Sequence, residues 1–357
     1  MLKILRACQH RNAKVTIFCQ HWEGEVPANT KVVLLSGQGF TRVAQRGCFV
    51  DQTLAATIND FDLILGFNKM PGLDFYYAAD YCFAEKAYNE RSMLYRMTAR
   101  ARQYLDYEKA VFGKDSDTVS LLLSPIQKTE YARHYQTPDE RLITLPPGIK
   151  KDRRYGSDSQ AKRMLLRYQF SIPEDELLIL QIGSSFKTKG LERSLQAYAA
   201  LPEALRKRTH FYVIGEDAPE KYLHRAEVLN VAKHFRILKG RSDIADFLQA
   251  ADVLIHPSIK ESAGMVILEA IVAGLPVLAT ECCGYAFHIE KSDAGLICPA
   301  PFRQEELNRM LASMLEQEEQ RARWKTNGIE YGKNNDLYSM SETVAALLVQ
   351  AASAFVH

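Results

Sequence analysis

Two glutamates, Glu261 and Glu269, lie in the segment 252–284, which reads DVLIHPSIKESAGMVILEAIVAGLPVLATECCG. A short loop carries the first glutamate, and a predicted helix contains the second. The first N–H groups of a helix lack internal partners and the helix dipole is positive there, so small residues at its start let a phosphate approach closely. A carboxylate on each side of that phosphate could accept hydrogen bonds from sugar hydroxyls. The alternative is an ordinary strand–helix unit with two surface glutamates. The predicted helix opens at Ala263, Gly264 and Met265.

A second candidate is the loop 181–190, which reads QIGSSFKTKG and connects a predicted strand to a predicted helix. Gly183 gives its backbone conformational freedom, and Lys187 and Lys189 supply positive charge. Such a loop can bind phosphate, although lysines on a solvated turn are the alternative. Its position ahead of the glutamate segment, in the same series of strands and helices, favours the phosphate role.

Alternating strands and helices position both candidates. In the second half of the chain, short apolar runs alternate with amphipathic segments, which is typical of parallel βαβ units in a Rossmann-like layer. The first half is similar but less regular, with one long helix expected over about 85–111. The predicted strands are 14–19, 31–35, 61–67, 118–123, 177–183, 210–215, 235–238, 252–257 and 275–280.

The Pro146-Pro147-Gly148 turn is the expected hinge. We therefore predict an α/β fold with domains at 1–147 and 148–338, followed at 339–357 by a helix that packs back on the first domain. Two such layers would face each other across a cleft, where doubly wound sheets bind ligands.

Composition excludes several classes of function. The net charge is +2, so the chain as a whole lacks the excess of basic residues that is typical of nucleic-acid-binding proteins. No apolar run approaches the length of a membrane span, about 18 residues. The seven cysteines include no CxxC pair that would suggest a zinc site, and we expect free thiols in a reducing cytoplasm.

The glutamate segment resembles the family-4 retaining glycosyltransferases, which have the GT-B fold of two Rossmann-like domains. Glu261 and Glu269 match the family's E-x7-E pattern within an HPS…E.AG…LEA…G.PV.AT frame. The resemblance implies that Glu261 contacts the transferred sugar and Glu269 the ribose of the nucleotide. It also implies that no metal and no protein nucleophile take part, because the departing phosphate accepts the proton of the acceptor.

The same resemblance assigns further residues of the donor site. Lys189 matches the family's diphosphate-binding lysine, and Ser184 replaces the usual arginine, which leaves Lys187 as the candidate for a second charge. Arg241 lies in the loop expected to hold the uracil base, although a place beside a helix N-cap explains it equally well. Arg153, just after the hinge, could reach the phosphates.

The first half resembles the lipopolysaccharide core heptose glucosyltransferases in TIFCQHWEGEVP, GFNKMPGLDFYYAADYCFAEKAY and LLLSPIQKTEYARHYQTPDERLITLPPGI. That resemblance implies UDP-glucose as donor and an inner-core heptose as acceptor. Asn68 and Lys69 follow a predicted strand end and would line the acceptor entrance, where a lysine suits a phosphorylated heptose. A structured turn around Pro71-Gly72 is the alternative.

Residues 85–114 combine apolar positions at helical spacing with many basic and aromatic residues. Such a segment can lie on an anionic membrane surface, here the cytoplasmic face of the inner membrane. The alternative is a domain-packing helix with a solvated charged face.

The family's N-terminal domain begins with a strand and a glycine-rich loop, and we expect this chain to lack both because Leu2–Arg6 reads as the helix that follows them. One alternative to an active enzyme follows, a non-catalytic remnant that binds UDP-sugar. A second alternative is a family-4 transferase with another sugar or acceptor, because the E-x7-E frame alone does not choose the sugar.

Overall fold

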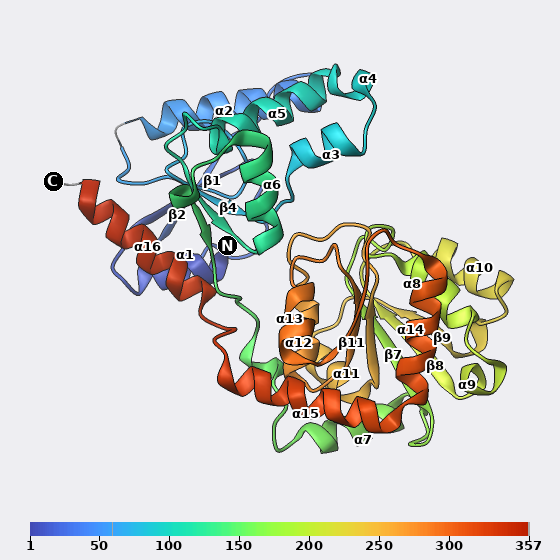
Figure 1. The fold of residues 1–357 in the computed structure, drawn as a ribbon. Helices are drawn as coiled ribbons and strands as arrows, with labels where there is room; N and C mark the ends of the chain where they lie inside the picture. The colour runs from blue at the N-terminus through green and yellow to red at the C-terminus, as the bar shows by residue number, and fades with distance from the viewer. Residues whose placement is uncertain (59, 356–357) are drawn as a thin grey trace. The chain divides into compact units, whose positions relative to one another are not determined.

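The computed structural model describes residues 1–58 and 60–355, and the chain forms two compact units (Figure 1). Unit 1 comprises residues 1–148 and the C-terminal segment from Ser339, and unit 2 comprises residues 149–338. The first boundary thus falls after Gly148, the last residue of the Pro-Pro-Gly turn, one residue later than predicted.

Unit 2 is built around a six-stranded parallel sheet with the order β12-β11-β10-β7-β8-β9. This is the doubly wound order in which the direction of strand addition reverses between β7 and β10, and ligands of such sheets bind outside the strand ends at that point. The strands are β7 (Leu177–Ile182), β8 (Thr209–Ile214), β9 (Phe235–Leu238), β10 (Val253–His256), β11 (Val277–Thr280) and β12 (Gly295–Cys298).

Helices cover both faces of this sheet, as the βαβ pattern requires. The helices are α7 (Ser159–Gln169), α8 (Leu191–Ala199), α9 (Glu203–Lys207), α10 (Glu220–Val228), α11 (Ile244–Ala250), α12 (Met265–Val272), α13 (Ala286–Ser292), α14 (Gln304–Glu316) and α15 (Glu318–Asn334), with short 3-10 turns η2 (Lys151–Arg153) and η3 (Ala232–His234).

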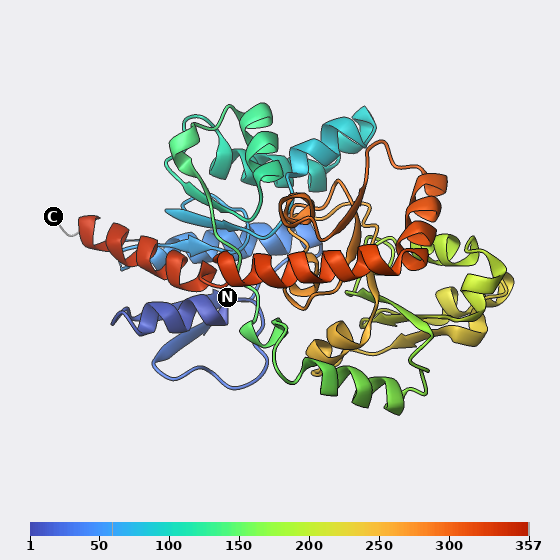
Figure 2. The ribbon, with the colours of Figure 1, turned by 60° about the horizontal axis from the view of Figure 1, so that its bottom comes forward.

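The described strands of unit 1 form two separate parallel sheets, β1-β2 and β3-β4-β5-β6. The helices α1 (Leu2–Gln9) and α16 (Met340–Phe355) cover one face of the sheet β3-β4-β5-β6, and they run side by side in Figures 1 and 2. The other elements are β1 (Val15–Cys19), β2 (Thr30–Leu34), α2 (Arg42–Thr57), β3 (Leu65–Gly66), β4 (Phe75–Ala78), α3 (Phe83–Asn89), α4 (Met93–Arg96), α5 (Ala99–Phe112), β5 (Val119–Leu122), α6 (Pro125–Tyr135), η1 (Asp139–Arg141) and β6 (Leu142–Thr144).

The long helix predicted over 85–111 is wrong, because this segment forms three helices, α3, α4 and α5. Hydroxyl side chains start two of them: Ser92 accepts from the N–H of Tyr95, and Thr98 accepts from the N–H of Ala101. Serine and threonine at these positions satisfy the first N–H groups of a new helix, which favours a restart over a continuous helix.

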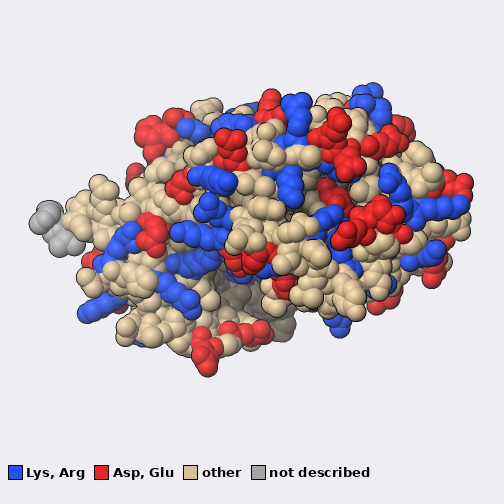
Figure 3. Space-filling view, turned by 90° about the horizontal axis from the view of Figure 1, so that it is seen from below, with Lys and Arg blue, Asp and Glu red and all other residues tan. Residues whose placement is uncertain are grey.

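Charged side chains of both signs are interspersed on the face shown in Figure 3, which agrees with the small net charge. Among the described residues, no helix combines the length and the apolar character needed to cross a bilayer.

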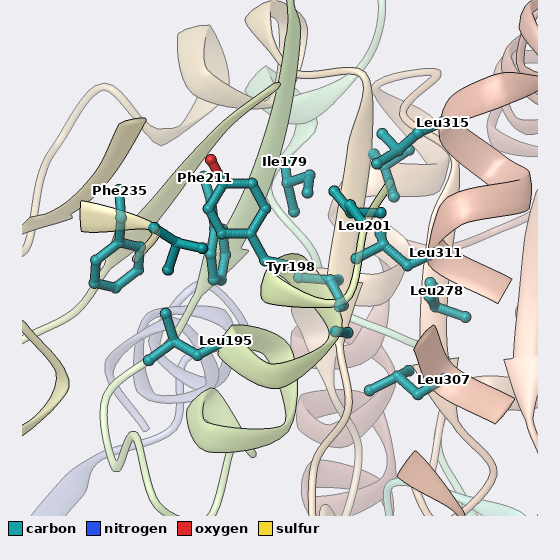
Figure 4. Packing of buried hydrophobic residues seen from close by; sticks show 14 of the residues in the cluster. Ile179, Leu195, Tyr198, Leu201, Phe211, Phe235, Leu278, Leu307, Leu311 and Leu315 are labelled. Atoms are coloured by element: carbon teal, nitrogen blue, oxygen red, sulfur yellow. The ribbon is translucent and has the colours of Figure 1, made fainter. Parts of the chain in front are cut away.

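The core of unit 2 explains why its strands read as continuous apolar runs. Ile179 of β7 and Phe211 of β8 pack against Leu195 of α8 and Leu311 of α14, as Figure 4 shows. Leu178 and Leu180 alternate with Ile179 and therefore point to the opposite face, where they are also fully buried. A sheet covered on both faces holds the carboxyl ends of its strands rigidly.

Candidate active site

Two loops leave the sheet of unit 2 at its switch point, residues 183–190 after β7 and residues 257–264 after β10. Gly190 has a φ of +71°, and a Cβ there would lie 2.0 Å from the carbonyl oxygen of Pro257. Only glycine therefore lets the backbones of the two loops touch. This contact brings both segments singled out from the sequence into one site.

Lys189 and Glu261 form an ion pair across these loops, with the ammonium of the lysine on Oε2 of the glutamate. Their side chains are 21% and 14% exposed. A Cβ on Gly183 would lie 3.3 Å from Cε of Lys189, so the glycine leaves room for the aliphatic part of the lysine. Gly183, which we predicted to contact the donor, thus also leaves space for the side chain of Lys189.

His256, the last residue of β10, is a member of the site that we did not predict. Its Nε2 atom lies 3.3 Å from Oε2 of Glu261 and 3.1 Å from Oγ of Ser258. Burial lowers the pKa of His256, so the imidazole is neutral near pH 7. Burial alone would raise the pKa of Glu261, but the hydrogen bond from His256 and the charge of Lys189 outweigh it and lower that pKa. The carboxylate is therefore ionised and can accept hydroxyl hydrogen bonds.

Helix α12 starts as predicted, directly after Gly264, which has a φ of +89°. Ala263 is buried, and its carbonyl accepts from the N–H of Tyr285 at 2.7 Å. The carbonyl of Glu261 accepts from the N–H of Gly284 at 3.1 Å, so the loop is fixed to the segment after β11. Met265, the first helical residue, is 49% exposed. A rigid loop of small residues thus precedes a helix N-terminus, which is the arrangement that suits a phosphate.

Glu269 lies one turn into α12, where it contacts Arg153 of η2. The Nε atom of Arg153 is 3.6 Å from Oε1 of Glu269, and the two side chains are 7% and 17% exposed. Burial raises the pKa of Glu269, and the charge of Arg153 only partly offsets this. Arg153, predicted to reach the phosphates, therefore lies beside the carboxylate predicted to hold the ribose.

The two remaining candidates of unit 2 lie near the surface. Arg241 donates two hydrogen bonds to the carboxylate of Asp243, at 2.8 and 2.7 Å, and its guanidinium lies 5.0 Å from the ring centre of Phe247. These contacts match the alternative of a place beside a helix start, since Asp243 is the N-cap of α11. Lys187 is exposed, two residues before Lys189.

In unit 1, Asn68 is exposed just after β3, but Lys69 is not placed as we predicted. The Lys69 side chain is 8% exposed, and its ammonium donates to Glu108 at 2.5 Å and to the carbonyl of Tyr81 at 3.0 Å. Glu108 is fully buried and needs this counter-charge. Lys69 therefore balances a buried carboxylate, and its contacts argue against a role in binding the phosphate of an acceptor.

Comparison with known proteins decides the family. Residues 163–331 match the model of the glycosyl transferases group 1. The chain is 40% identical to lipopolysaccharide glucosyltransferase WaaG of Escherichia coli (strain K12), over 97% of this chain and 93% of that protein. The chain belongs to the WaaG family of glycosyltransferases. It is accordingly an enzyme with the GT-B fold, as predicted.

Solved structures agree with this WaaG-family assignment. A crystal structure of WaaG matches with a TM-score of 0.91 and 39% identity, over 97% of this chain and 94% of that one. The Anabaena protein HepE, solved in complex with UDP and glucose, matches with a TM-score of 0.73 over 98% of this chain and 95% of that one. Its identity is 17%, so that likeness shows the fold alone.

Sequence reasoning missed His256 and the contact between Arg153 and Glu269. His256 could have been found from its place at a strand end, five residues before Glu261. The pairing of Arg153 with Glu269 could not, because 116 residues separate them and only the packing of η2 on α12 and α11 joins them.

Proposed function

We propose that this WaaG-family enzyme transfers glucose from UDP-glucose to a heptose of the lipopolysaccharide inner core, with retention at the anomeric carbon. The observation that carries the proposal is the convergence of Lys189, Glu261 and Glu269 around the start of α12 at the switch point. The relationship to an enzyme named lipopolysaccharide glucosyltransferase supports the choice of sugar and acceptor.

Each residue has a defined part in the proposed reaction. The diphosphate lies at the N-terminus of α12, and Lys189 exchanges Glu261 for a phosphate oxygen. Glu261, released from that ion pair, accepts hydrogen bonds from glucose hydroxyls, and Glu269 accepts them from the ribose. Gly183, Ala263, Gly264 and Met265 offer backbone contacts, while Lys187, Arg153 and Arg241 are weaker candidates for the nucleotide.

The bond changes balance without a protein nucleophile. The bond from the anomeric carbon to the phosphate oxygen breaks, and a bond from the same carbon to the acceptor oxygen forms on the same face. The acceptor's proton goes to the departing phosphate, which gives UDP and the glucosylated core. Fixed cations and N–H groups stabilise the charge that develops on the diphosphate. The proposed reaction needs no metal ion, so activity is expected to persist in EDTA.

Transfer assays test the donor and the acceptor together. The purified chain is given a core-truncated lipopolysaccharide that ends at the inner-core heptose, with radiolabelled UDP-glucose, UDP-galactose or UDP-N-acetylglucosamine in parallel reactions. We expect incorporation from UDP-glucose, with an α-linkage in the product. Incorporation from another donor instead would support a different sugar, and UDP binding without any transfer would support the non-catalytic alternative. The match along 97% of the chain does not favour that alternative.

We further propose that residues 85–114 attach the enzyme to an anionic membrane surface on the cytoplasmic side. Met93 and Leu94 of α4 are 70% and 77% exposed, and Met97 is 56% exposed. Arginines flank them in the sequence at positions 91, 96, 100 and 102. Exposed apolar side chains among arginines fit a surface of acyl chains under anionic headgroups.

A cavity of about 550 Å³ lies beside this segment and adds to the argument. Arg102 and Lys109 of α5 and Arg133 of α6 line it together with Asp106, so basic side chains outnumber acidic ones in its lining. Vesicle sedimentation tests the proposal. Binding to phosphatidylglycerol vesicles, but not phosphatidylcholine vesicles, is expected to fall in Met93→Gln/Leu94→Gln and to persist in Met164→Gln/Leu165→Gln, which alters a matched exposed pair on α7. Equal binding by both variants would refute it.

A further inference from the structure

Three side chains with metal-binding atoms meet at the amino edge of the sheet of unit 2. Glu176 directly precedes β7, His210 is the second residue of β8, and His234 directly precedes β9. These strands are parallel neighbours, with Leu178 opposite His210 and Phe211 opposite Phe235. Their starts therefore lie at one edge, and the loops of the candidate active site leave the opposite edge.

The three side chains converge closely. Oε2 of Glu176 lies 2.5 Å from Nε2 of His210, and the rings of His210 and His234 are nearly perpendicular with centres 4.7 Å apart. One ligand atom from each residue lies within 4.8 Å of both others. His210 is buried, whereas the Glu176 side chain is 24% exposed and His234 is partly exposed. The group is therefore partly accessible to solvent, through Glu176 and His234.

We propose that Glu176, His210 and His234 form a binding site for a divalent transition-metal ion of the zinc type, with water as the fourth ligand. Two imidazoles and one carboxylate are a donor set that such ions accept in tetrahedral geometry. Nothing in the proposed transfer reaction uses these residues.

The present spacing requires only small movements to bind an ion. Ligands at about 2.0–2.2 Å from a tetrahedral zinc ion are about 3.3–3.5 Å apart. Glu176 and His210 would separate by less than about 1 Å from their present contact as the ion replaces their shared hydrogen bond. His234 moves inward, which its place at the end of the short turn η3 permits.

The surroundings hold two of the ligands in place. Arg167 donates a hydrogen bond to the backbone carbonyl of Glu176, and the ring of Tyr212 packs edge-on against His210, with centres 6.0 Å apart. These contacts fix the backbone of Glu176 and the ring plane of His210. The competing interpretation is a plain histidine–carboxylate pair that joins β7 to β8, with His234 beside it by chance. A metal-binding experiment separates the two.

The site is expected to stabilise the fold rather than to take part in transfer. An ion held by residues at the starts of β7, β8 and β9 would link three chain segments that are far apart in the sequence. Binding to the folded state alone raises the unfolding temperature as the ion concentration rises above its dissociation constant.

The test uses the full chain, stripped with EDTA and dialysed. Zn²⁺ is measured by equilibrium dialysis, and Co²⁺ is followed by its visible absorption, which is intense for tetrahedral sites. We expect one equivalent of bound metal and a rise in unfolding temperature. His234→Gln and Glu176→Gln should weaken binding by more than about tenfold. The matched control His224→Gln, which alters an exposed histidine of α10, should not.

Thiols are the main competitor for zinc in this chain, so Cys282→Ser is included. Binding that is lost in Cys282→Ser but kept in His234→Gln would overturn the proposal, as would the absence of bound metal in the unaltered protein. Weaker binding in both His234→Gln and Glu176→Gln, with unchanged unfolding temperatures of the metal-free variants, would support it. Folding defects do not confuse the outcome, because neither altered side chain is fully buried.

Discussion

Arg153 and Glu269 contact each other within unit 2, with Nε of the arginine 3.6 Å from Oε1 of the glutamate. That separation is too long for a hydrogen bond, and Nε of Arg153 is buried without a hydrogen-bond partner. The arginine therefore acts on Glu269 through its charge and leaves the carboxylate's lone pairs available. A ribose diol could occupy them without displacing the arginine.

UDP affinity should depend on pH through Glu269. Burial raises the pKa of this carboxyl group. The ionised form accepts hydrogen bonds from the ribose hydroxyls through both oxygens, whereas protonation turns one of these oxygens into a donor. The affinity of the unaltered enzyme should therefore fall as the pH is lowered through that raised pKa. In Glu269→Gln, UDP should bind about tenfold more weakly at neutral pH, and this pH dependence should be lost. Calorimetry of UDP binding from about pH 5 to about pH 8 measures both effects. Glu220→Gln, on the exposed start of α10, is the control.

Lys189 and Glu261 should differ in what they contribute to donor binding. Lys189→Ala removes the cation that meets the leaving diphosphate, so kcat/KM should fall by about 10²–10³ and UDP should bind more weakly. Glu261→Ala should leave UDP affinity nearly unchanged and remove the additional affinity that glucose provides. Calorimetry with UDP and UDP-glucose separates these cases. Lys187→Ala is the comparison, and a larger loss there than in Lys189→Ala would reverse the assignment.

Lys69 should matter for stability and not for the acceptor. Glu108 also accepts from the backbone N–H groups of Phe83 and Ala84, at 2.7 Å each, but Lys69 supplies its ion pair. Lys69→Met should lower the free energy of unfolding by about 3 kcal/mol, because it leaves a buried carboxylate without its partner. Urea denaturation measures this loss, and Lys109→Met on the exposed face of α5 is the control. A higher KM for the acceptor at unchanged stability would restore the original prediction.

Gly190 should tolerate no side chain. An added methyl group would meet the Pro257 carbonyl in a backbone region that glycine prefers, so the loops after β7 and β10 would be forced apart. Gly190→Ala should lower both the unfolding temperature and UDP affinity. Gly47→Ala is a suitable control, because it lies within α2 and the nearest atom to its Cβ would be 3.7 Å away. A variant with unchanged UDP affinity would show that the loop contact does not shape the site.

Cys282 should be the most reactive thiol near neutral pH. A hydrogen bond from Cys283, another from Thr280 and the charge of Arg193 lower its pKa to about 7 against the opposing effect of burial. Its Sγ atom also lies 3.1 Å from the carbonyl oxygen of Ser258, in the loop that carries Glu261. Iodoacetamide should therefore label Cys282 first, with a rate that rises through about pH 7, and labelling should reduce UDP binding. Mass spectrometry of the labelled peptides would expose a different first target.

The sequence by itself determined the layered architecture of unit 2 and the start of α12. Apolar runs of strand length indicate strands that are buried on both faces of the sheet, and Gly264 followed by an apolar segment indicates the turn that precedes α12. Both patterns are local in the sequence. The restart of helices at Ser92 and Thr98 was also local, and the prediction of one long helix overlooked these caps.

Tertiary structure decided the partners of the charged side chains. Lys69 was predicted to bind an acceptor but forms an ion pair with Glu108, which is 39 residues away in the sequence. Lys189 forms an ion pair with Glu261, which is 72 residues away. Sequence patterns record the period of an element and therefore which face is buried. They do not record which strand ends become neighbours in the folded sheet. The order of the strands determines whether a cationic side chain is available to a ligand or is paired with a carboxylate from a distant part of the chain.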